Sequence, residues 1–316
     1  MTTTSTRPET EQRDDRGPSR RPVSRSAAKS DRTARDRKVG SLRKSRRVSW
    51  FTYTVLAVAV LLALAPLYWM FVVGSNSSSA VSQFPPVFTP GGNFPKNLDI
   101  INGTVPFGRS LINSAIVAVS VALLQIFFCS LAGFAFAKLQ FRGRNWLFIA
   151  VVATMAIPGQ LGLVPMYMIM SSLGWVDTLQ ALIVPGAVSA FGVFWMRQVI
   201  VGSIPDELVE AGRVDGASTF RIFRSIVLPN IRGSAAVFGL FAAMSAWNDF
   251  LWPLVILNTP DNFTSQVAIQ QLRTQYTIDY STVMTGSVLA TIPLLLLFLL
   301  AGRQLVAGIM DGAVKG

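Results

Sequence analysis

The chain has 316 residues, 51% of them hydrophobic and only 14% charged, with a formal net charge of +12. This charged fraction lies well below the roughly 25% of soluble domains, so a soluble globular protein is excluded and a membrane protein is favoured. The absence of His excludes His-based catalysis and His metal ligands, and the single cysteine, Cys129, excludes an intramolecular disulfide and disfavours a metal site.

Residues 1–48 carry most of the excess positive charge and almost no large apolar side chains. Such a segment cannot bury enough apolar surface to fold, so we expect a disordered basic extension. Basic residues beside a first membrane helix are the usual mark of the inner side of a membrane. This placement argues against a role in binding nucleic acid.

Six apolar segments follow, each long enough to cross a hydrocarbon core of roughly 30 Å at about 1.5 Å per residue. They cover residues 50–73, 111–137, 146–170, 179–200, 234–257 and 284–306. Several contain proline, as at Pro158 and Pro185, but neighbouring helices can satisfy the carbonyl groups that a proline frees. We therefore expect an all-α membrane protein in which residues 49–316 form one six-helix transmembrane domain.

The loops between these segments predict the orientation of the chain, because Lys and Arg accumulate on the cytoplasmic side. The basic residues of the loops after the second and fourth segments are Lys138, Arg142, Arg144, Arg213, Arg221, Arg224 and Arg232. Both termini, the loop 201–232 and the tail 307–316 are thus expected in the cytoplasm. Residues 74–108 are expected to form an irregular extracellular loop, and residues 258–283 a long outer loop.

The cytoplasmic loop 201–232 has a distinctive pattern of helix and turn signals. Ser203-Ile204-Pro205-Asp206 predicts a helix start of the capping-box type, and acids in a first turn suit the positive end of the helix dipole. Asp215-Gly216 predicts a turn, because Gly tolerates the left-handed conformation that ends helices. Ser218 or Thr219 is then expected to cap a second helix that Pro229 ends. Two short helices meeting at a glycine predict a compact knob.

The same loop resembles the EAA loop of ATP-binding-cassette (ABC) importer permeases, which reads E-A-A-x-x-x-G-x9-I-x-L-P. The matching positions are Glu210, Ala211, Gly216, Ile226, Leu228 and Pro229, and Gly212 stands where a second Ala is expected. Four further stretches are similar to the carbohydrate branch of these permeases: 109–114, 132–137, 247–253 and the closing 312–316. The chain is most similar to the smaller, six-helix permease of maltose-type importers.

This resemblance implies a type I, MetI-like permease fold and a non-enzymatic subunit of a sugar importer in the plasma membrane. The chain would form half of a pathway for a di- or oligosaccharide, together with a second homologous permease and an extracellular solute-binding protein. The residues implied in coupling to a separate ATPase dimer are Glu210, Ala211, Gly212, Asp215, Gly216, Ile226, Leu228 and Pro229. The chain has no Walker-A motif, so ATP and Mg are expected on that ATPase, and no cofactor or metal on this chain.

Polar and aromatic residues near the expected pathway are candidates for contact with the sugar, because polar groups at membrane depth are costly and often functional. They are Asn113, Gln125, Trp247, Asn248, Asp249, Gln270, Gln271 and Tyr276. Asp249 either accepts sugar hydroxyls or makes a hydrogen bond within the bundle. The Trp side chains either pack, anchor at the membrane interface or stack on sugar. The resemblance implies that Gln270, Gln271 and Tyr276 help to release sugar.

The alternative function is a proton- or sodium-coupled secondary transporter, for which Asp249 is the main ionisable candidate. Such transporters usually contain inverted repeats, and no repeat is visible in this sequence. A membrane-embedded enzyme would need paired acids, a nucleophile with its base, or metal ligands within the spans. The apolar segments offer almost none of these groups.

Overall fold

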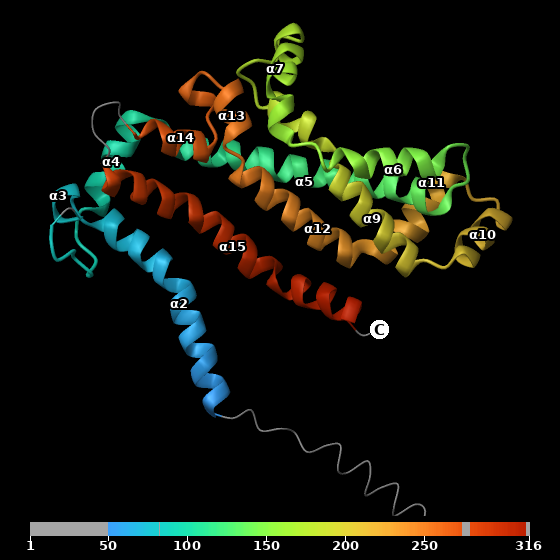
Figure 1. Cartoon of the computed structure of the whole chain (residues 1–316), viewed down its shortest axis with the longest axis horizontal. Helices are drawn as coiled ribbons and strands as arrows, with labels where there is room; N and C mark the ends of the chain where they lie inside the picture. Colours follow the sequence, from blue (N-terminus) through green and yellow to red (C-terminus); the bar gives the residue numbers. More distant parts are fainter. Residues whose placement is uncertain (1–49, 82, 274–278, 314–316) are drawn as a thin grey trace, which may run out of the picture. The chain divides into compact units, whose positions relative to one another are not determined.

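The computed structural model describes residues 50–81, 83–273 and 279–313, which form helices joined by short 3-10 and π turns (Figure 1). The predicted extension 1–48 lies outside the described residues. Residues 62–316 form one compact unit, and the packing below concerns this unit. The fold class predicted from the sequence, an all-α membrane protein, is confirmed.

Four helical stretches in the described part of the chain are long and apolar enough to cross a membrane. They are α2 (Trp50–Ser75), α5 (Phe107–Lys138), Thr219–Asn248, and Tyr280–Leu299 of α15 (Tyr280–Ala313). The number rises to six if each of two bent pairs is one span: Arg144–Thr154 (α6) with Gly159–Ser172 (η1 and α7), and Gln180–Ala187 (α8 and η2) with Ala190–Ser203 (α9). The bends measure 95° and 41°. The third and fourth predicted spans are therefore broken rather than continuous.

Prolines start the short turns at these breaks, and side chains satisfy backbone groups there. Pro158 precedes η1 (Gly159–Gly162), and Pro185 opens η2 (Pro185–Ala187). The Gln125 amide of α5 donates to the Gly186 carbonyl at 2.8 Å and accepts from the Ser189 hydroxyl at 3.2 Å. Ser189 also caps α9 by accepting from the Gly192 N–H at 3.1 Å. Such bonds make a broken helix tolerable at membrane depth.

The fifth predicted span is also interrupted. Helix α12 (Leu228–Asn248) and helix α13 (Leu251–Ile256) are separated at Asp249, whose backbone is extended with φ −65° and ψ 128°. An extended residue cannot continue the helical hydrogen-bond ladder, so the chain changes direction here. This break places a carboxylate between two helices rather than on the side of one.

Helix α5 is the centre of the unit and packs closely against α9 and α12 (Figure 1). At Gly133 of α5, an added Cβ would lie 2.8 Å from the backbone nitrogen of Arg197 and 2.9 Å from the carbonyl carbon of Met196, both in α9. A glycine is therefore needed at this crossing, in the way that small residues let membrane helices approach. Phe134, Met196 and Ile200 fill the surrounding core.

The segment 74–108 is more ordered than the irregular loop predicted for it. It contains α3 (Ser78–Val81) and α4 (Phe94–Thr104), with Pro95 in the first turn of α4, where its missing N–H has no cost. The buried Asn97 amide donates to the Gly74 carbonyl at 2.9 Å, and the Thr285 hydroxyl donates to the same carbonyl at 2.7 Å. These bonds join α2, α4 and α15. They depend on distant residues, so the local sequence gave no sign of them.

The connection between α7 (Leu163–Ser172) and α8 (Gln180–Ile183) is held by Asp177, a non-glycine residue with φ 62°. Its carboxylate accepts from the N–H groups of Asn258 at 2.8 Å and Thr259 at 3.0 Å, and from the Thr259 hydroxyl at 2.7 Å. Slight burial acts to raise the pKa of Asp177, but these hydrogen bonds outweigh it and hold the pKa below its usual range. This side chain thus fixes residues 258–262 beside α8.

The α5–α9 crossing gives a test of the packing. We expect Gly133→Ala to destabilise the protein by about 1–3 kcal/mol, because the neighbouring backbone cannot yield easily. Gly108→Ala in the same helix is the matched control, since a Cβ there meets no atom within 4 Å. It should be neutral or stabilising by up to about 1 kcal/mol. The measurement is thermal unfolding of the detergent-solubilised protein, and equal effects of the two changes would contradict the close crossing.

Candidate functional site

The first helix of the predicted knob is α10 (Asp206–Val214), and it begins differently from the sequence prediction. The N-cap is Pro205, and Ser203 is the last residue of α9, so the predicted capping box does not form. The fixed φ of Pro205 suits the extended entry to α10, so the helix starts after Pro205 and Ser203 lies two residues before the N-cap position. Asp206 and Glu207 do lie in the first turn, as predicted.

The predicted turn after α10 is confirmed. Gly216 has φ 76°, the left-handed conformation that glycine adopts at little cost. Its N–H donates to the Arg213 carbonyl at 3.0 Å, and the Ala217 N–H donates to the Gly212 carbonyl at 3.0 Å. This pair of bonds is a Schellman motif, which satisfies the last carbonyls of a helix and reverses the chain.

The second helix continues further than predicted. Ser218 caps α11 (Thr219–Ile222) by accepting from the Arg221 N–H at 3.3 Å, which confirms one of the two predicted caps. A π turn, η3 (Phe223–Val227), then joins α11 to α12. The prediction that Pro229 ends this helix is wrong, because Pro229 lies in the first turn of α12. The wider π turn accommodates the proline ring, which would otherwise clash with a carbonyl four residues earlier.

Gly212 explains how the two helices of the knob pack together. An added Cβ at this position would lie 3.1 Å from Cδ1 of Ile226 and 3.3 Å from Cγ1 of Ile222. Gly212 therefore allows α10 to approach Ile222 and Ile226 closely. The structure brings all eight predicted coupling residues into or beside this knob, which we define as residues 206–229.

The knob exposes apolar side chains as well as charges. Val214 is 87% exposed and Phe220 is 55% exposed, while Glu210 and Ala211 lie exposed on α10. Apolar side chains gathered on an exposed surface and surrounded by charges are typical of a contact with another protein. The knob therefore has the composition of a docking surface.

An ion pair joins the knob to the central helix, and the sequence analysis missed it. The Lys138 ammonium, at the end of α5, lies 2.5 Å from a carboxylate oxygen of Asp206. The Lys138 side chain is only 6% exposed, whereas that of Asp206 is 77% exposed. A hydrogen bond from Lys138 and its charge lower the pKa of Asp206, which keeps the carboxylate ionised. The sequence offered only a weak signal, a lysine and an aspartate 68 residues apart at the ends of two helices.

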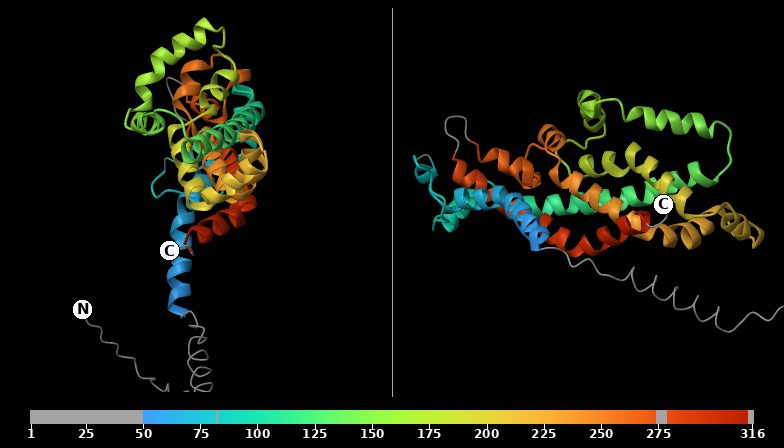
Figure 2. Two further views of the ribbon diagram at one scale, coloured as in Figure 1. Left: turned by 90° about the vertical axis from the view of Figure 1, so that its right-hand side faces the viewer. Right: turned by 60° about the horizontal axis from the view of Figure 1, so that its bottom comes forward.

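Figures 1 and 2 show that α10 lies beyond the end of α5 at which α6 begins. Helices α4 and α14 (Ser265–Gln271) lie at the opposite end of α5. The coupling residues and the residues of α14 are thus separated by the length of the central helix.

Gln125 and Asp249 are predicted pathway residues that the structure places beside open space. Asp249 lines two hollows of about 330 Å³ and 280 Å³, which also share Leu182 and Gly186. Gln125 lines the larger hollow, and Trp252 lines the smaller one. The Asp249 carboxylate also receives hydrogen bonds from the first backbone N–H groups of α13. Both interpretations raised by the sequence, a pathway group and a bond within the bundle, have a geometric basis.

The other candidate pathway residues lie away from these hollows. Trp247 is buried among alanines, and its indole N–H has no hydrogen-bond partner in the described structure. The Asn248 amide donates to the Met244 carbonyl of its own helix at 2.8 Å. The Asn113 amide donates to the carbonyls of Asp261 at 2.9 Å and Phe263 at 3.0 Å, so it holds the loop before α14.

The remaining candidates lie at or after α14. Gln270 is half-buried and Gln271 is exposed, both in the last turn of α14. Tyr276 lies outside the described residues. The described part of segment 258–283, which the sequence predicts as an outer loop, thus contains a 3-10 turn, η4 (Pro260–Asn262), and the helix α14. Arg109 of α5 forms an ion pair with Asp261 at 3.2 Å, which adds to the bonds that hold this segment.

Comparisons with known proteins agree with this arrangement. Residues 125–310 match the family described as the binding-protein-dependent transport system inner membrane component. The arabinooligosaccharides transport system permease protein AraQ of Halalkalibacterium halodurans is 36% identical over 204 residues, or 65% of this chain and 73% of that protein. The lactose transport system permease protein LacG of Rhizobium radiobacter is 32% identical and covers 83% of this chain and 95% of its own length.

The sn-glycerol-3-phosphate transport system permease protein UgpE of Escherichia coli (strain K12) is also 32% identical, with the same coverage of 83% and 95%. Among solved structures, a chain of a bacterial ABC transporter involved in the import of the acidic polysaccharide alginate has the same fold. It has a TM-score of 0.68 and 22% identity, and the match covers 83% of this chain and 97% of that one.

Membership of this family favours an ATP-driven importer over the ion-coupled transporter that the sequence left open. The matched residues include the whole knob and Asp249, and the match is supported by relatives along most of the chain. An importer of this kind is a multi-subunit complex in which a partner ATPase uses the ATP. The chain belongs to the binding-protein-dependent transport system inner membrane component family, as a multi-pass inner-membrane permease subunit, not an enzyme, of a carbohydrate-uptake-type ABC importer.

Proposed function

We propose that this chain forms one half of the pathway for a neutral di- or oligosaccharide and is driven by an ATPase that contacts the knob. A second homologous permease completes the pathway. An extracellular solute-binding protein delivers the sugar, and an ATPase dimer binds ATP and Mg. In this arrangement the knob and both termini are cytoplasmic, and α14 lies on the outer side. The observation that carries the proposal is Asp249 at the break between α12 and α13, beside two hollows lined by residues of α5, α8, α12 and α13.

The charge around Asp249 favours a neutral sugar over a phosphorylated substrate. None of the residues that line the two hollows is Lys or Arg. A phosphate group facing the Asp249 carboxylate would be repelled and would find no cation to pair with. Sugar hydroxyls, in contrast, can donate hydrogen bonds to a carboxylate, and hydrogen bonds to charged groups are stronger than neutral ones. Among the relatives, this supports a substrate of the lactose or arabinooligosaccharide type over glycerol 3-phosphate.

Coupling follows from the connection between the knob and α5. The exposed Glu210, Ala211 and Val214 face a partner ATPase, and closure of the ATPase dimer moves α10. The Lys138–Asp206 ion pair then transmits this movement to α5, which carries Gln125. The continuous helical stretch from α11 to α12 transmits it to Asp249, which follows α12. Gln270 and Gln271 lie on the outer side. They help the binding protein to release the sugar, because they compete with the binding protein for hydrogen bonds to it.

The turn at Gly216 gives a test of the coupling role. Gly216→Val puts a β-branched residue at φ 76°, which costs about 1–2 kcal/mol and displaces α10 from α11. We expect uptake and transport-linked ATP hydrolysis to fall together, by about tenfold. Gly174→Val is the matched control, since Gly174 has φ 69° and open space around it and lies outside the knob. If the two variants lose stability equally but both keep full coupling, the knob does not couple ATP hydrolysis to transport.

The ion pair between α5 and α10 gives a second test. Asp206→Asn leaves the almost buried Lys138 ammonium without its carboxylate, so α10 is no longer held to α5. We expect transport-linked ATP hydrolysis to fall by about two- to fivefold. Glu207→Gln removes a neighbouring charge from the same turn, where the structure records no ion pair, and should have no effect. Equal activity of the two variants would mean that the ion pair is not part of the coupling.

Asp249 gives a third test, which separates transport from stability. Asp249→Asn keeps the size of the side chain and removes a charged acceptor worth about 1.5–3 kcal/mol to a bound hydroxyl. We expect uptake of a disaccharide to fall at least about tenfold while the complex still assembles. Asp261→Asn makes the same chemical change at an exposed ion pair and serves as the control. A lower melting temperature with unchanged uptake kinetics would identify Asp249 as a cap of α13 only.

A further inference from the structure

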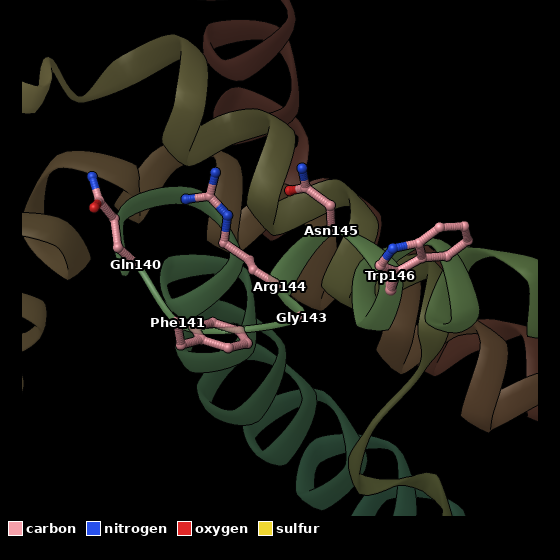
Figure 3. A pocket seen from close by; sticks show the side chains of 6 residues that line it. All are labelled: Gln140, Phe141, Gly143, Arg144, Asn145 and Trp146. Carbon is pink, nitrogen blue, oxygen red and sulfur yellow. The ribbon is translucent and has the colours of Figure 1, made fainter.

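The loop between α5 and α6 borders an open surface hollow that none of the roles above uses. It has a volume of about 440 Å³ and is lined by Gln140, Phe141, Gly143, Arg144, Asn145 and Trp146. Figure 3 shows the side chains of Gln140, Arg144 and Asn145 extending to one side of the loop, with the Phe141 ring below Arg144 and the Trp146 ring at the far end from Gln140. The hollow therefore combines hydrogen-bond donors with aromatic side chains.

The donors in this hollow suit an anion. The Arg144 guanidinium uses one nitrogen, Nη1, to donate to the Leu139 carbonyl at 3.1 Å, which leaves its other N–H groups for a ligand. The amides of Gln140 and Asn145 make no recorded hydrogen bond to the described part of the protein. None of the lining residues is acidic, and the exposed Arg142 adds a second positive charge. Asp206, an acid that the Arg144 charge also stabilises, is already paired with Lys138.

The hollow also lies at the level of a membrane surface. It occupies the connection between α5, a candidate span that ends at Lys138, and the bent pair that begins at Arg144. A connection between two successive spans has to lie where the chain leaves the bilayer. Trp146 is 79% exposed and Phe141 is 41% exposed, and aromatic side chains of this kind gather at membrane interfaces.

We propose that this hollow binds the headgroup of an anionic phospholipid, such as phosphatidylglycerol, on the cytoplasmic side. The Arg144 guanidinium holds the phosphate, the amides of Gln140 and Asn145 bond its oxygens or the glycerol hydroxyls, and Phe141 and Trp146 lie along the upper acyl chains. Basic pockets at the cytoplasmic ends of membrane helices bind anionic headgroups in this way. The proposal rests on the inward orientation proposed above for the α5–α6 loop. It places a lipid beside the Lys138–Asp206 ion pair.

The test uses the assembled importer in bilayer discs of phosphatidylcholine with an increasing fraction of phosphatidylglycerol. Native mass spectrometry then counts the phosphatidylglycerol molecules that stay bound. We expect Arg144→Gln to weaken retention of phosphatidylglycerol by about fivefold, the effect of one basic residue at an anionic surface. Arg232→Gln is the matched control, because it removes an exposed cytoplasmic charge outside the hollow and should leave retention unchanged.

Two further variants test whether Arg144→Gln weakens lipid retention by altering the loop rather than by removing a contact with the lipid. Asn145→Leu removes one amide while the Arg144–Leu139 hydrogen bond stays intact, and it should also weaken retention. Arg144→Lys keeps the charge but not the planar fork, so its effect should lie between those of wild type and Arg144→Gln.

Three results would overturn the proposal. The first is equal retention by the Arg144→Gln and Arg232→Gln variants. The second is release of phosphatidylglycerol by millimolar inorganic phosphate, which would make the hollow a site for the free anion. The third is loss of the ATPase from the Arg144→Gln complex with lipid retention unchanged, which would make the hollow a protein contact. A reporter fused at Arg142 that reads out on the outer side would contradict the proposed orientation instead, independently of the lipid count.

Discussion

The close packing of α5 against α9 and α12 is the constraint on which the other features depend. The α5–α9 crossing at Gly133 leaves no room for a side chain, so the two helices cannot slide or separate without losing their core. Gln125 and Lys138 lie on this same helix, about 20 Å apart at 1.5 Å per residue. One rigid element therefore positions both the hollow beside Asp249 and the contact with the knob.

The broken spans share one physical requirement, which is to satisfy the backbone groups that each break frees. Each break frees backbone groups that a continuous helix would satisfy, and in an apolar environment such groups are costly unless another partner is found. Gln125 and Ser189 supply the partners beside Gly186, and the Asp249 carboxylate lies against the start of α13. Gln125 and Asp249 thus lie both at the breaks and beside the open space.

The sequence predicted the features that depend on local composition. Apolar length located the spans, and Gly216 and Ser218 located the turn and the cap between the two helices of the knob, because each acts within a few residues. The sequence did not predict the bends at Pro158 and Pro185, since proline is compatible with both continuous and broken spans. Pro66 and Pro293, for example, lie inside continuous helices.

The sequence pattern could not predict the contacts between distant residues, for a different reason. The Lys138–Asp206 ion pair and the Asn97 and Thr285 bonds to Gly74 depend on how helices pack, and one sequence contains no measure of that distance. Asn113 was expected in the pathway, yet its amide holds the loop before α14. Polarity within an apolar segment predicted that these residues form specific interactions, but not which interaction each one makes.

The π turn at Phe223–Val227 has a consequence for how such permeases diverge from one another. A π turn adds one residue to a helical turn, and one residue rotates everything beyond it by about 100° around the helix axis. The direction in which α10 points relative to α12 is therefore set by the number of residues between Ser218 and Pro229, as well as by their identity. Insertion or loss of a single residue here would turn α10 toward another side of α12, with its exposed side chains unchanged.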